Sequence, residues 1–278
     1  LIINDYEHQI QWTVGVNGAH NRNVVKKISN VLKTMNEKNR EAKFDEPLPI
    51  YEEGKSLNQV FTVRSLGIDP ASGREMYLTK DGKSDYTWSA ADQVVIGQEV
   101  YLKRNGEKTF VWDAVDKVPM GDSQPKWNGS ISSSFLYKSW SVNLGFTYSL
   151  GARTYNQTLV DKIENSSVAY NLDRRAIKAR WSRDNRDAKY KSIKLIGNST
   201  PQSSRFLQKE NKLTFSSISV GYRFDPKRFK FLQACRVGSL SLNAAMNDIA
   251  VISTIRQERG LEYPFARSFN LSLSVLFN

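Results

Sequence analysis

Residues 268–277, SFNLSLSVLF, alternate polar and apolar side chains at every position except Leu276. The apolar positions are Phe269, Leu271, Leu273, Val275 and Phe277. A period of two residues is typical of a β-strand with one apolar and one polar face. The stretch is also long enough to cross a bilayer as a tilted strand, which takes about 9–11 residues. It therefore predicts a strand whose apolar face meets either a soluble core or lipid.

The same alternation recurs upstream, in residues 10–17, 127–137, 140–149, 213–224 and 238–247. Residues 213–224 change phase midway, and a one-residue β-bulge near Ser216 and Ser217 would restore one apolar face. Residues 138–139 are left as a tight connection between two strands. Weaker candidates at residues 60–64 and 74–78 bring the prediction to about eight antiparallel strands, too few for a complete barrel with such long loops.

The polar faces of these strands favour a membrane over a soluble sandwich. They consist of Ser, Asn, Thr and Gly, and Arg223 is the only charge well inside them. Soluble strands usually display charged side chains that deter edge pairing. Aromatic residues such as Trp127, Tyr137 and Trp140 gather near strand ends, as the interfacial girdles of a transmembrane barrel do. We therefore expect an all-β fold, the transmembrane antiparallel β-barrel.

Composition excludes several other classes of protein. The chain has 278 residues, enough for one large domain or two small ones at about 150 residues each. Its single cysteine, Cys235, excludes an internal disulfide framework and a cysteine-based zinc site. With a mean hydropathy of −0.51 and no long apolar run, it is not a helical membrane protein. Without an initiator Met or signal peptide, we interpret it as a piece of a longer protein or a processed chain.

Charge is concentrated in the long loop at residues 150–212. Residues 151–212 contain 14 Lys/Arg and 6 Asp/Glu, and so carry most of the chain's net charge of +12. A helix is expected over residues 158–181. If residues 267–277 run toward the periplasm, alternation places residues 138–139 and 225–237 in the periplasm and this basic loop outside the cell.

Residues 75–122 contain a tandem repeat. Residues 75–98 align with residues 99–122 at a 24-residue offset, with nine identical pairs that include Trp88/Trp112. Asp81-Gly82 and Asn105-Gly106 are favoured hairpin-turn pairs, so each copy is expected to form its own small β-hairpin. The duplication could reach a partner or cover the pore, or it could be a tolerated insertion.

The candidate contact residues lie in the charged loop and the repeat; they are Arg174, Arg175, Arg180, Trp181, Trp88 and Trp112. The arginine cluster, which continues through Arg183 and Arg186, suggests nucleic-acid binding, but no recognisable domain surrounds it. A solvated face is the simplest interpretation of such a run. Contact with lipopolysaccharide or with a lipoprotein is the main functional alternative.

Catalytic patterns are missing from the sequence. Its two histidines, His8 and His20, form no metal motif, and neither a phosphate-binding loop nor a nucleophile elbow is present. No pair of carboxylates is placed for acid–base work, so we expect no enzyme activity, no metal and no cofactor.

Several strings follow one another as in a known family. They are GIDPASGREMYL (67–78), DQVVIG (92–97), GDSQPKWNGSISSSFLYKSWSVN (121–143), YNQTLVDKIEN (155–165), YNLDRRAI (170–177), SSRFLQKENKLTFSSISVGYRF (203–224), MNDI (246–249) and QERGLEYPFARSFNLSLSVLF (257–277). In this order they resemble the late barrel of SusC/RagA-like TonB-dependent outer-membrane transporters. Two departures are the doubled hairpin segment and Asn278 after the terminal aromatic.

The resemblance implies a barrel of about 22 strands with a plug and a TonB box that this chain does not contain. It implies uptake of oligosaccharides or peptides across the outer membrane of Bacteroidota. The implied partners are a SusD-like surface lipoprotein, the TonB-ExbB-ExbD system through a region outside this chain, and outer-membrane lipid and lipopolysaccharide, with no nucleic acid. The competing hypothesis is a soluble or surface-attached β-rich module that binds glycans through the tryptophan-bearing repeat.

Overall fold

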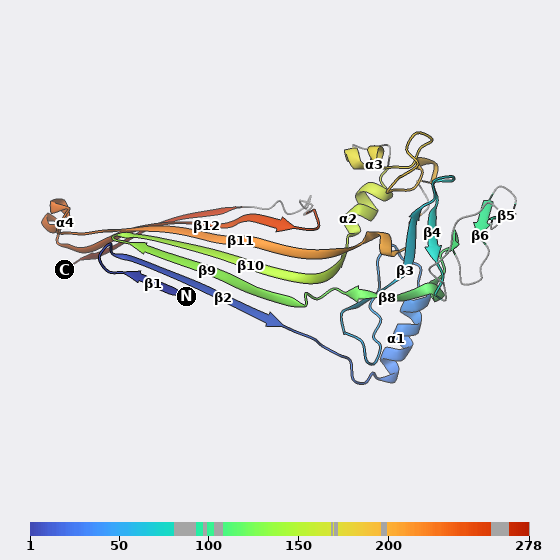
Figure 1. The fold of residues 1–278 in the computed structure, drawn as a ribbon, viewed down its shortest axis with the longest axis horizontal. Helices are drawn as coiled ribbons and strands as arrows, with labels where there is room; N and C mark the ends of the chain where they lie inside the picture. Colours follow the sequence, from blue (N-terminus) through green and yellow to red (C-terminus); the bar gives the residue numbers. More distant parts are fainter. Residues whose placement is uncertain are drawn as a thin grey trace. The chain divides into compact units, whose positions relative to one another are not determined.

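The computed structural model describes residues 1–80, 93–96, 99–102, 108–167, 169, 172–195, 199–256 and 267–277 (Figure 1). The chain forms two compact units. Unit 1 comprises Leu1–Asn21, Pro125–Gly151 and Glu210–Asn278, and unit 2 comprises Arg22–Gln124 and Ala152–Lys209. Each unit is therefore assembled from segments that are distant in sequence. No helix in the described ranges has the length and apolar character needed to cross a membrane.

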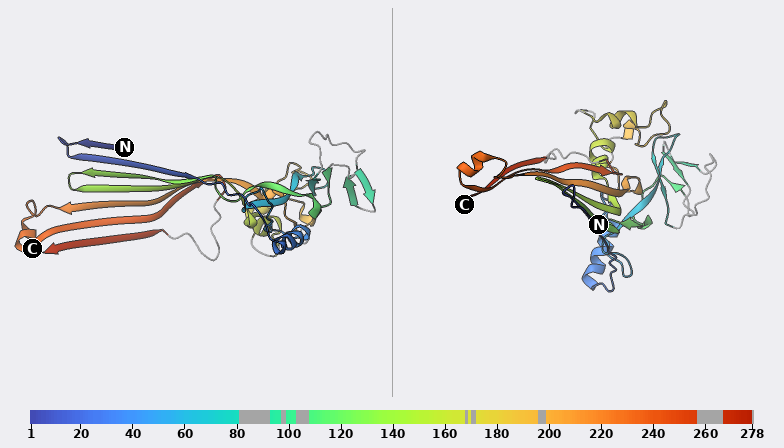
Figure 2. Two further views of the ribbon diagram at one scale, coloured as in Figure 1. Left: turned by 90° about the horizontal axis from the view of Figure 1, so that it is seen from below. Right: turned by 60° about the vertical axis from the view of Figure 1, so that its left-hand side comes forward.

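Unit 1 is an antiparallel sheet of seven strands in the order β1-β2-β9-β10-β11-β12-β13, drawn side by side in Figures 1 and 2. The strands are β1 (Ile2–Asp5), β2 (Ile10–His20), β9 (Trp127–Tyr137), β10 (Trp140–Tyr155), β11 (Leu207–Phe224), β12 (Val237–Ser253) and β13 (Ser268–Phe277). The last residues of β10 and the first of β11 belong to unit 2. All six strongly patterned strands of the sequence are confirmed, whereas β1 was not predicted.

The register gives this sheet one continuous apolar face. Tyr222 pairs with Leu242, which pairs in turn with Leu273. Two of the side chains on this face, Phe146 and Phe215, stack at 4.6 Å. A register shift between Phe215 and Ser217 confirms the predicted β-bulge, which keeps both halves of β11 on the same face.

Polar side chains occupy the opposite face and bond to one another between strands. Asn17 Nδ2 donates to Ser130 Oγ at 2.8 Å, and Asn143 Nδ2 donates to Ser219 Oγ at 3.1 Å. The charged residues of β11 that belong to unit 1, Glu210, Lys212 and Arg223, lie toward the two ends of this strand. An uncharged, hydrogen-bonded wall of this kind suits a polar barrel interior.

One end of unit 1 carries its short connections. Residues 138–139 link β9 to β10, and Lys138 adopts a φ of 53°, the left-handed conformation that tight hairpin turns require. The connection from β11 to β12 includes α4 (Lys230–Ala234), which lies at the same end in Figure 1. The two segments of unit 2 leave and re-enter the sheet at the other end of its strands. Short turns at one end and long insertions at the other are typical of outer-membrane barrels.

Unit 2 has its own small sheet, in the order β7-β4-β3-β8, and a separate β5-β6 pair. Its elements are α1 (Asn30–Glu41), β3 (Gln59–Ile68), β4 (Glu75–Leu78), β5 (Gln93–Ile96), β6 (Glu99–Leu102), β7 (Lys108–Thr109), η2 (Ala114–Asp116), β8 (Lys117–Asp122), α2 (Gln157–Leu159), the π-helix η3 (Val160–Glu164), α3 (Arg174–Lys178), η4 (Ile193–Leu195) and η5 (Ser204–Phe206). The weaker strand candidates, now β3 and β4, therefore do not belong to the barrel sheet. Their apolar residues are buried within unit 2 instead, as Phe61 and Val63 show.

Two further predictions are corrected in unit 2. The single helix expected over residues 158–181 is broken into α2, η3 and α3, and α1 was not predicted. Among the described residues of the repeat, strands pair between the two copies and not within one copy. Strand β4 of the first copy pairs with β3 on one edge and with β7 of the second copy on the other, while β5 of the first copy pairs with β6 of the second. The turn pairs Asp81-Gly82 and Asn105-Gly106 lie outside the described residues.

Candidate functional site

The predicted contact residues of the basic loop are carried by a small hydrophobic core in unit 2. Val160 and Ile163 of η3, Ala176 of α3, Tyr190 and Phe206 pack together and are all buried. The π-helix places Val160, Ile163 and Glu164 on its buried side. Because this core joins four separate stretches of the loop, the loop is a folded structure.

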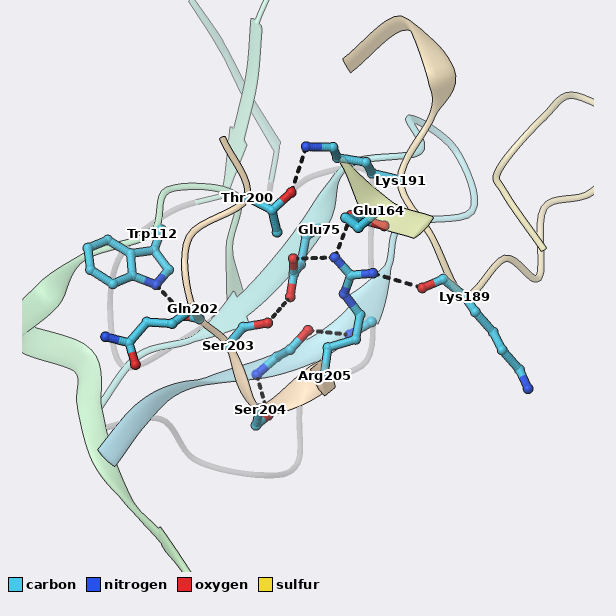
Figure 3. A network of polar contacts seen from close by, with 12 residues as sticks. Glu75, Trp112, Glu164, Lys189, Lys191, Thr200, Gln202, Ser203, Ser204 and Arg205 are labelled. Atoms are coloured by element: carbon cyan, nitrogen blue, oxygen red, sulfur yellow. Dashed lines mark hydrogen bonds and ion pairs between the residues drawn. The ribbon is translucent and has the colours of Figure 1, made fainter. Parts of the chain in front are cut away.

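A buried ion network lies beside this core (Figure 3). Arg205 Nη2 lies 2.8 Å from Glu75 Oε2 and 2.6 Å from Glu164 Oε1, so one guanidinium joins β4 to η3. Ser203 Oγ donates to Glu75 Oε1 at 2.6 Å, and Arg205 Nη1 donates to the carbonyl of Lys189 at 2.8 Å. Breaking such a network is costly because a lone buried charge would remain.

The electrostatics of Glu75 follow from these neighbours. Burial alone would raise the pKa of its carboxyl group, but the guanidinium of Arg205 and the hydroxyl of Ser203 outweigh burial, and the pKa lies below its usual value of 4.5. The phenol of Tyr77, buried beside this carboxylate, has its pKa raised by burial first and by the charge of Glu75 second. Glu75 is therefore ionised, and it serves to hold β4 against the basic loop.

Arg180 is part of the interior and not of the surface. It is only 4% exposed, and its guanidinium donates to the carbonyls of Ala176, Lys191, Ile163 and Glu164 at 2.6–3.1 Å. Ile163 and Glu164 are the last two residues of η3, where backbone carbonyls lack an intrahelical partner. Arg180 therefore uses its guanidinium donors inside unit 2, and its predicted contact with a partner stays a prediction.

Two of the predicted contact residues, Trp181 and Trp112, donate hydrogen bonds to backbone carbonyls of other segments. Trp181 Nε1 donates to the carbonyl of Pro70 at 3.0 Å, and its ring covers Gly73, where a Cβ would lie 2.5 Å from the ring. Trp112 Nε1 donates to the carbonyl of Gln202 at 2.8 Å. Both indole N–H groups are thus occupied within unit 2. Trp88 lies outside the described residues.

The remaining arginines of the cluster differ in exposure and in whether they form an ion pair. Arg175 forms an ion pair with Asp173 at 2.7 Å at the start of α3, whereas Arg174, Arg183 and Arg186 are exposed. Beside α3 lies a recess of about 150 Å³ that the sequence reasoning missed. Its apolar lining residues, such as Ile177 and Ile193, lie too far apart in the sequence for the pattern to show that they meet.

The described part of the chain holds no group of three His, Cys, Asp or Glu residues placed to bind an ion. The basic loop is thus a folded, strongly cationic surface structure that the core and the Arg205 ion network stabilise. Such a structure can bind another molecule, and no described residue set in it points to a reaction.

A partial antiparallel barrel sheet with large folded insertions at one end defines the class: the chain has the fold of a section of a TonB-dependent transporter barrel. Solved structures of the RagAB peptide transporter match at a TM-score of 0.71 and 16% identity, over 99% of this chain and 28% of that chain. The RagAB peptide importer also matches in its "open-open" state, with a TM-score of 0.72, and in its "closed-closed" state, with a TM-score of 0.70, both at 16% identity and over 99% of this chain.

The resemblance to SusC/RagA-like transporters is thus confirmed at the level of the fold. The chain spans about 28% of the length of the transporter chains that it matches. The sequence itself matches no protein-family model and no curated protein.

Proposed function

We propose that the chain is a section of an outer-membrane transporter that imports nutrients, with unit 1 in the membrane and unit 2 outside the cell. The observation that carries this proposal is the uncovered apolar face of unit 1. In β13 alone, Phe269, Leu271 and Leu273 are each more than 60% exposed. Soluble monomers rarely expose contiguous apolar surface of this extent, and lipid is the environment that would cover it.

The proposed substrate is a peptide, taken up with the help of a surface lipoprotein and the TonB system. Support comes from the matched structures, which are described as a peptide transporter and a peptide importer. Because the likeness covers only part of those chains, an oligosaccharide is the alternative cargo. Neither cargo requires chemistry from the described residues.

Fractionation and uptake by cells that express the full-length protein test this proposal. We expect the protein in the outer-membrane fraction, soluble only in detergent, and labelled oligopeptide uptake that stops when the gene is deleted or the proton gradient is collapsed. Recovery as a folded protein in the aqueous fraction would contradict the membrane assignment and favour the glycan-binding module. Loss of oligosaccharide uptake with unchanged peptide uptake would contradict the peptide assignment.

A further inference from the structure

A small apolar recess opens beside α3 in unit 2. It has a volume of about 150 Å³, and its lining residues are Ser166, Leu172, Ala176, Ile177, Arg180, Trp181, Ser182 and Ile193. Two of these, Ile177 and Ile193, are 65% and 51% exposed. Single exposed apolar residues are ordinary on protein surfaces. Two exposed isoleucines at the edge of one apolar recess form a site that a partner could cover.

The size of the recess restricts what it can hold. Apolar cavities of about 150 Å³ accept a benzene-sized group. Arg180, although it lines the recess, has its guanidinium donors directed to four backbone carbonyls, so it offers little to a polar ligand. The recess therefore fits one large apolar side chain.

The charge around the recess restricts which molecule can supply that side chain. Within residues 172–195, the exposed ionisable side chains comprise six cations and two acids; they are Arg174, Lys178, Arg183, Arg186, Lys189 and Lys194, with Asp184 and Asp187. A partner with complementary charge is acidic. The phosphates of a nucleic acid or of a lipopolysaccharide headgroup would use the cations but not the apolar recess.

We propose that the recess at Ile177 and Ile193 docks an acidic protein segment, which inserts one large apolar side chain such as Leu or Phe. The occupant is a segment of the surface lipoprotein, so the inference rests on the proposed function. In such an interface the buried apolar anchor sets the lifetime of the complex, and the surrounding charges set the rate of encounter. The arginine cluster thereby steers the partner, while the two isoleucines hold it.

The test measures binding of the purified lipoprotein to the full-length transporter in detergent. Ile177→Asp and Ile193→Asp should each weaken binding about tenfold or more, mainly through faster dissociation, because each places a carboxylate at the apolar anchor site. The matched controls are Val31→Asp on α1 and Val115→Asp, at apolar side chains of unit 2 that are 79% and 70% exposed and lie outside the recess. Arg186→Glu should slow association and reduce its dependence on salt.

A photo-reactive benzoylphenylalanine at position 193 gives a readout that does not depend on the isoleucine variants folding. It should cross-link to an acidic segment of the lipoprotein. If the lipoprotein binds but the two isoleucine variants behave like the controls, or the cross-link maps elsewhere, the recess is not the docking site and the proposed partnership stands. If the wild-type transporter binds no lipoprotein, the proposed partnership and this inference both fail.

Discussion

Arg205 joins two buried carboxylates that come from separate segments of unit 2, Glu75 and Glu164. The carboxylates of Glu75 and Glu164 share the single guanidinium of Arg205. Glu164 Oε2 has no hydrogen-bond partner among the described residues. The network therefore has little tolerance for a lost cation. Lys191 is itself engaged with Thr200 at 2.6 Å and is not free to replace it.

Arg205→Met should destabilise unit 2 locally by about 3–5 kcal/mol, because the carboxylates of Glu75 and Glu164 would remain buried without their cation. Hydrogen exchange of the full-length protein in detergent would show this as faster exchange in η3 and η5. Arg186→Met, at an exposed arginine of the same loop, is the matched control and should leave exchange unchanged. Equal exchange in the two variants would mean that the network does not stabilise unit 2.

The lowered pKa of Glu75 predicts that unit 2 loses stability in acid. Its pKa is lowered below 4.5 in the folded protein, so the unfolded chain binds more protons in the window below that value. Its contribution to stability is thus fully present above pH 4.5 and is lost as the pH falls toward the lowered pKa. Exchange protection of η5 should decline between about pH 5 and pH 3, and Glu75→Gln should make the decline shallower. The exposed Glu46→Gln should keep the wild-type profile.

Gly129 lets Tyr148 lie across the apolar face of unit 1, where Tyr148 Oη donates to the carbonyl of Asn17 at 3.0 Å. A Cβ at Gly129 would meet that carbonyl oxygen and lie 2.6 Å from Tyr148 Oη. We expect Gly129→Ala to cost about 1–3 kcal/mol, lowering the temperature at which the detergent-solubilised barrel loses its compact gel mobility. Gly145→Ala is the control, since its Cβ would meet only side-chain atoms of Ser216 and Ser217. Similar losses in both variants would contradict this account.

Among the elements, the repeat has the most informative pairing. The sheet of unit 2 takes β4 from the first copy and takes β7 and β8 from the second, so together they supply one complete set of strands. The strands left over, β5 and β6, pair with each other. This pairing is the one expected if a 24-residue duplication placed β5 and β6 between the strands of a single sheet.

Deleting residues 79–102 should leave the sheet of unit 2 intact. The deletion joins Leu78 to Lys103, so that residues 103–107 with Asn105-Gly106 form the loop between the paired Leu78 and Lys108. A hairpin loop of about five residues is within the ordinary range. Exchange protection of β3 and β8 should match that of the full-length protein. Deleting residues 99–122 instead removes β7 and β8 and should abolish it.

The strands of unit 1 could be predicted from the sequence because a period of two is a local property, visible in each strand separately. Even the bulge in β11 followed from a change of phase. The membership of β3 and β4 could not be predicted, since the same short alternation fits either sheet and only the fold shows that they pair with each other, with β7 and with β8. The same holds for Arg180: its position in a basic cluster indicated a surface, and only the fold brings four carbonyls around it. Helix α1 has a serine N-cap, Ser29, but no clear apolar stripe.

At the scale of the whole molecule, the proposed orientation in the membrane can be tested with the exposed natural thiol of Cys235. This residue follows α4, at the end of the sheet assigned to the periplasm. A membrane-impermeant maleimide should label it only after the outer membrane is permeabilised. In a Cys235→Ser background, Arg186→Cys in the basic loop should be labelled on intact cells. The reverse pattern would invert the assignment.

The construction of unit 2 from two segments has a consequence for how the protein is made. Ser65 N donates to Ser204 Oγ across 139 positions of sequence, and the strands β9 and β10 lie between the two segments. Contacts of such long range form slowly, because a large loop must close first. The first segment therefore waits, with its apolar residues uncovered, until the second has arrived. During that interval proteases and chaperones can reach the first segment. Unit 2 can be completed only after the β9–β10 hairpin between its two segments has been synthesised.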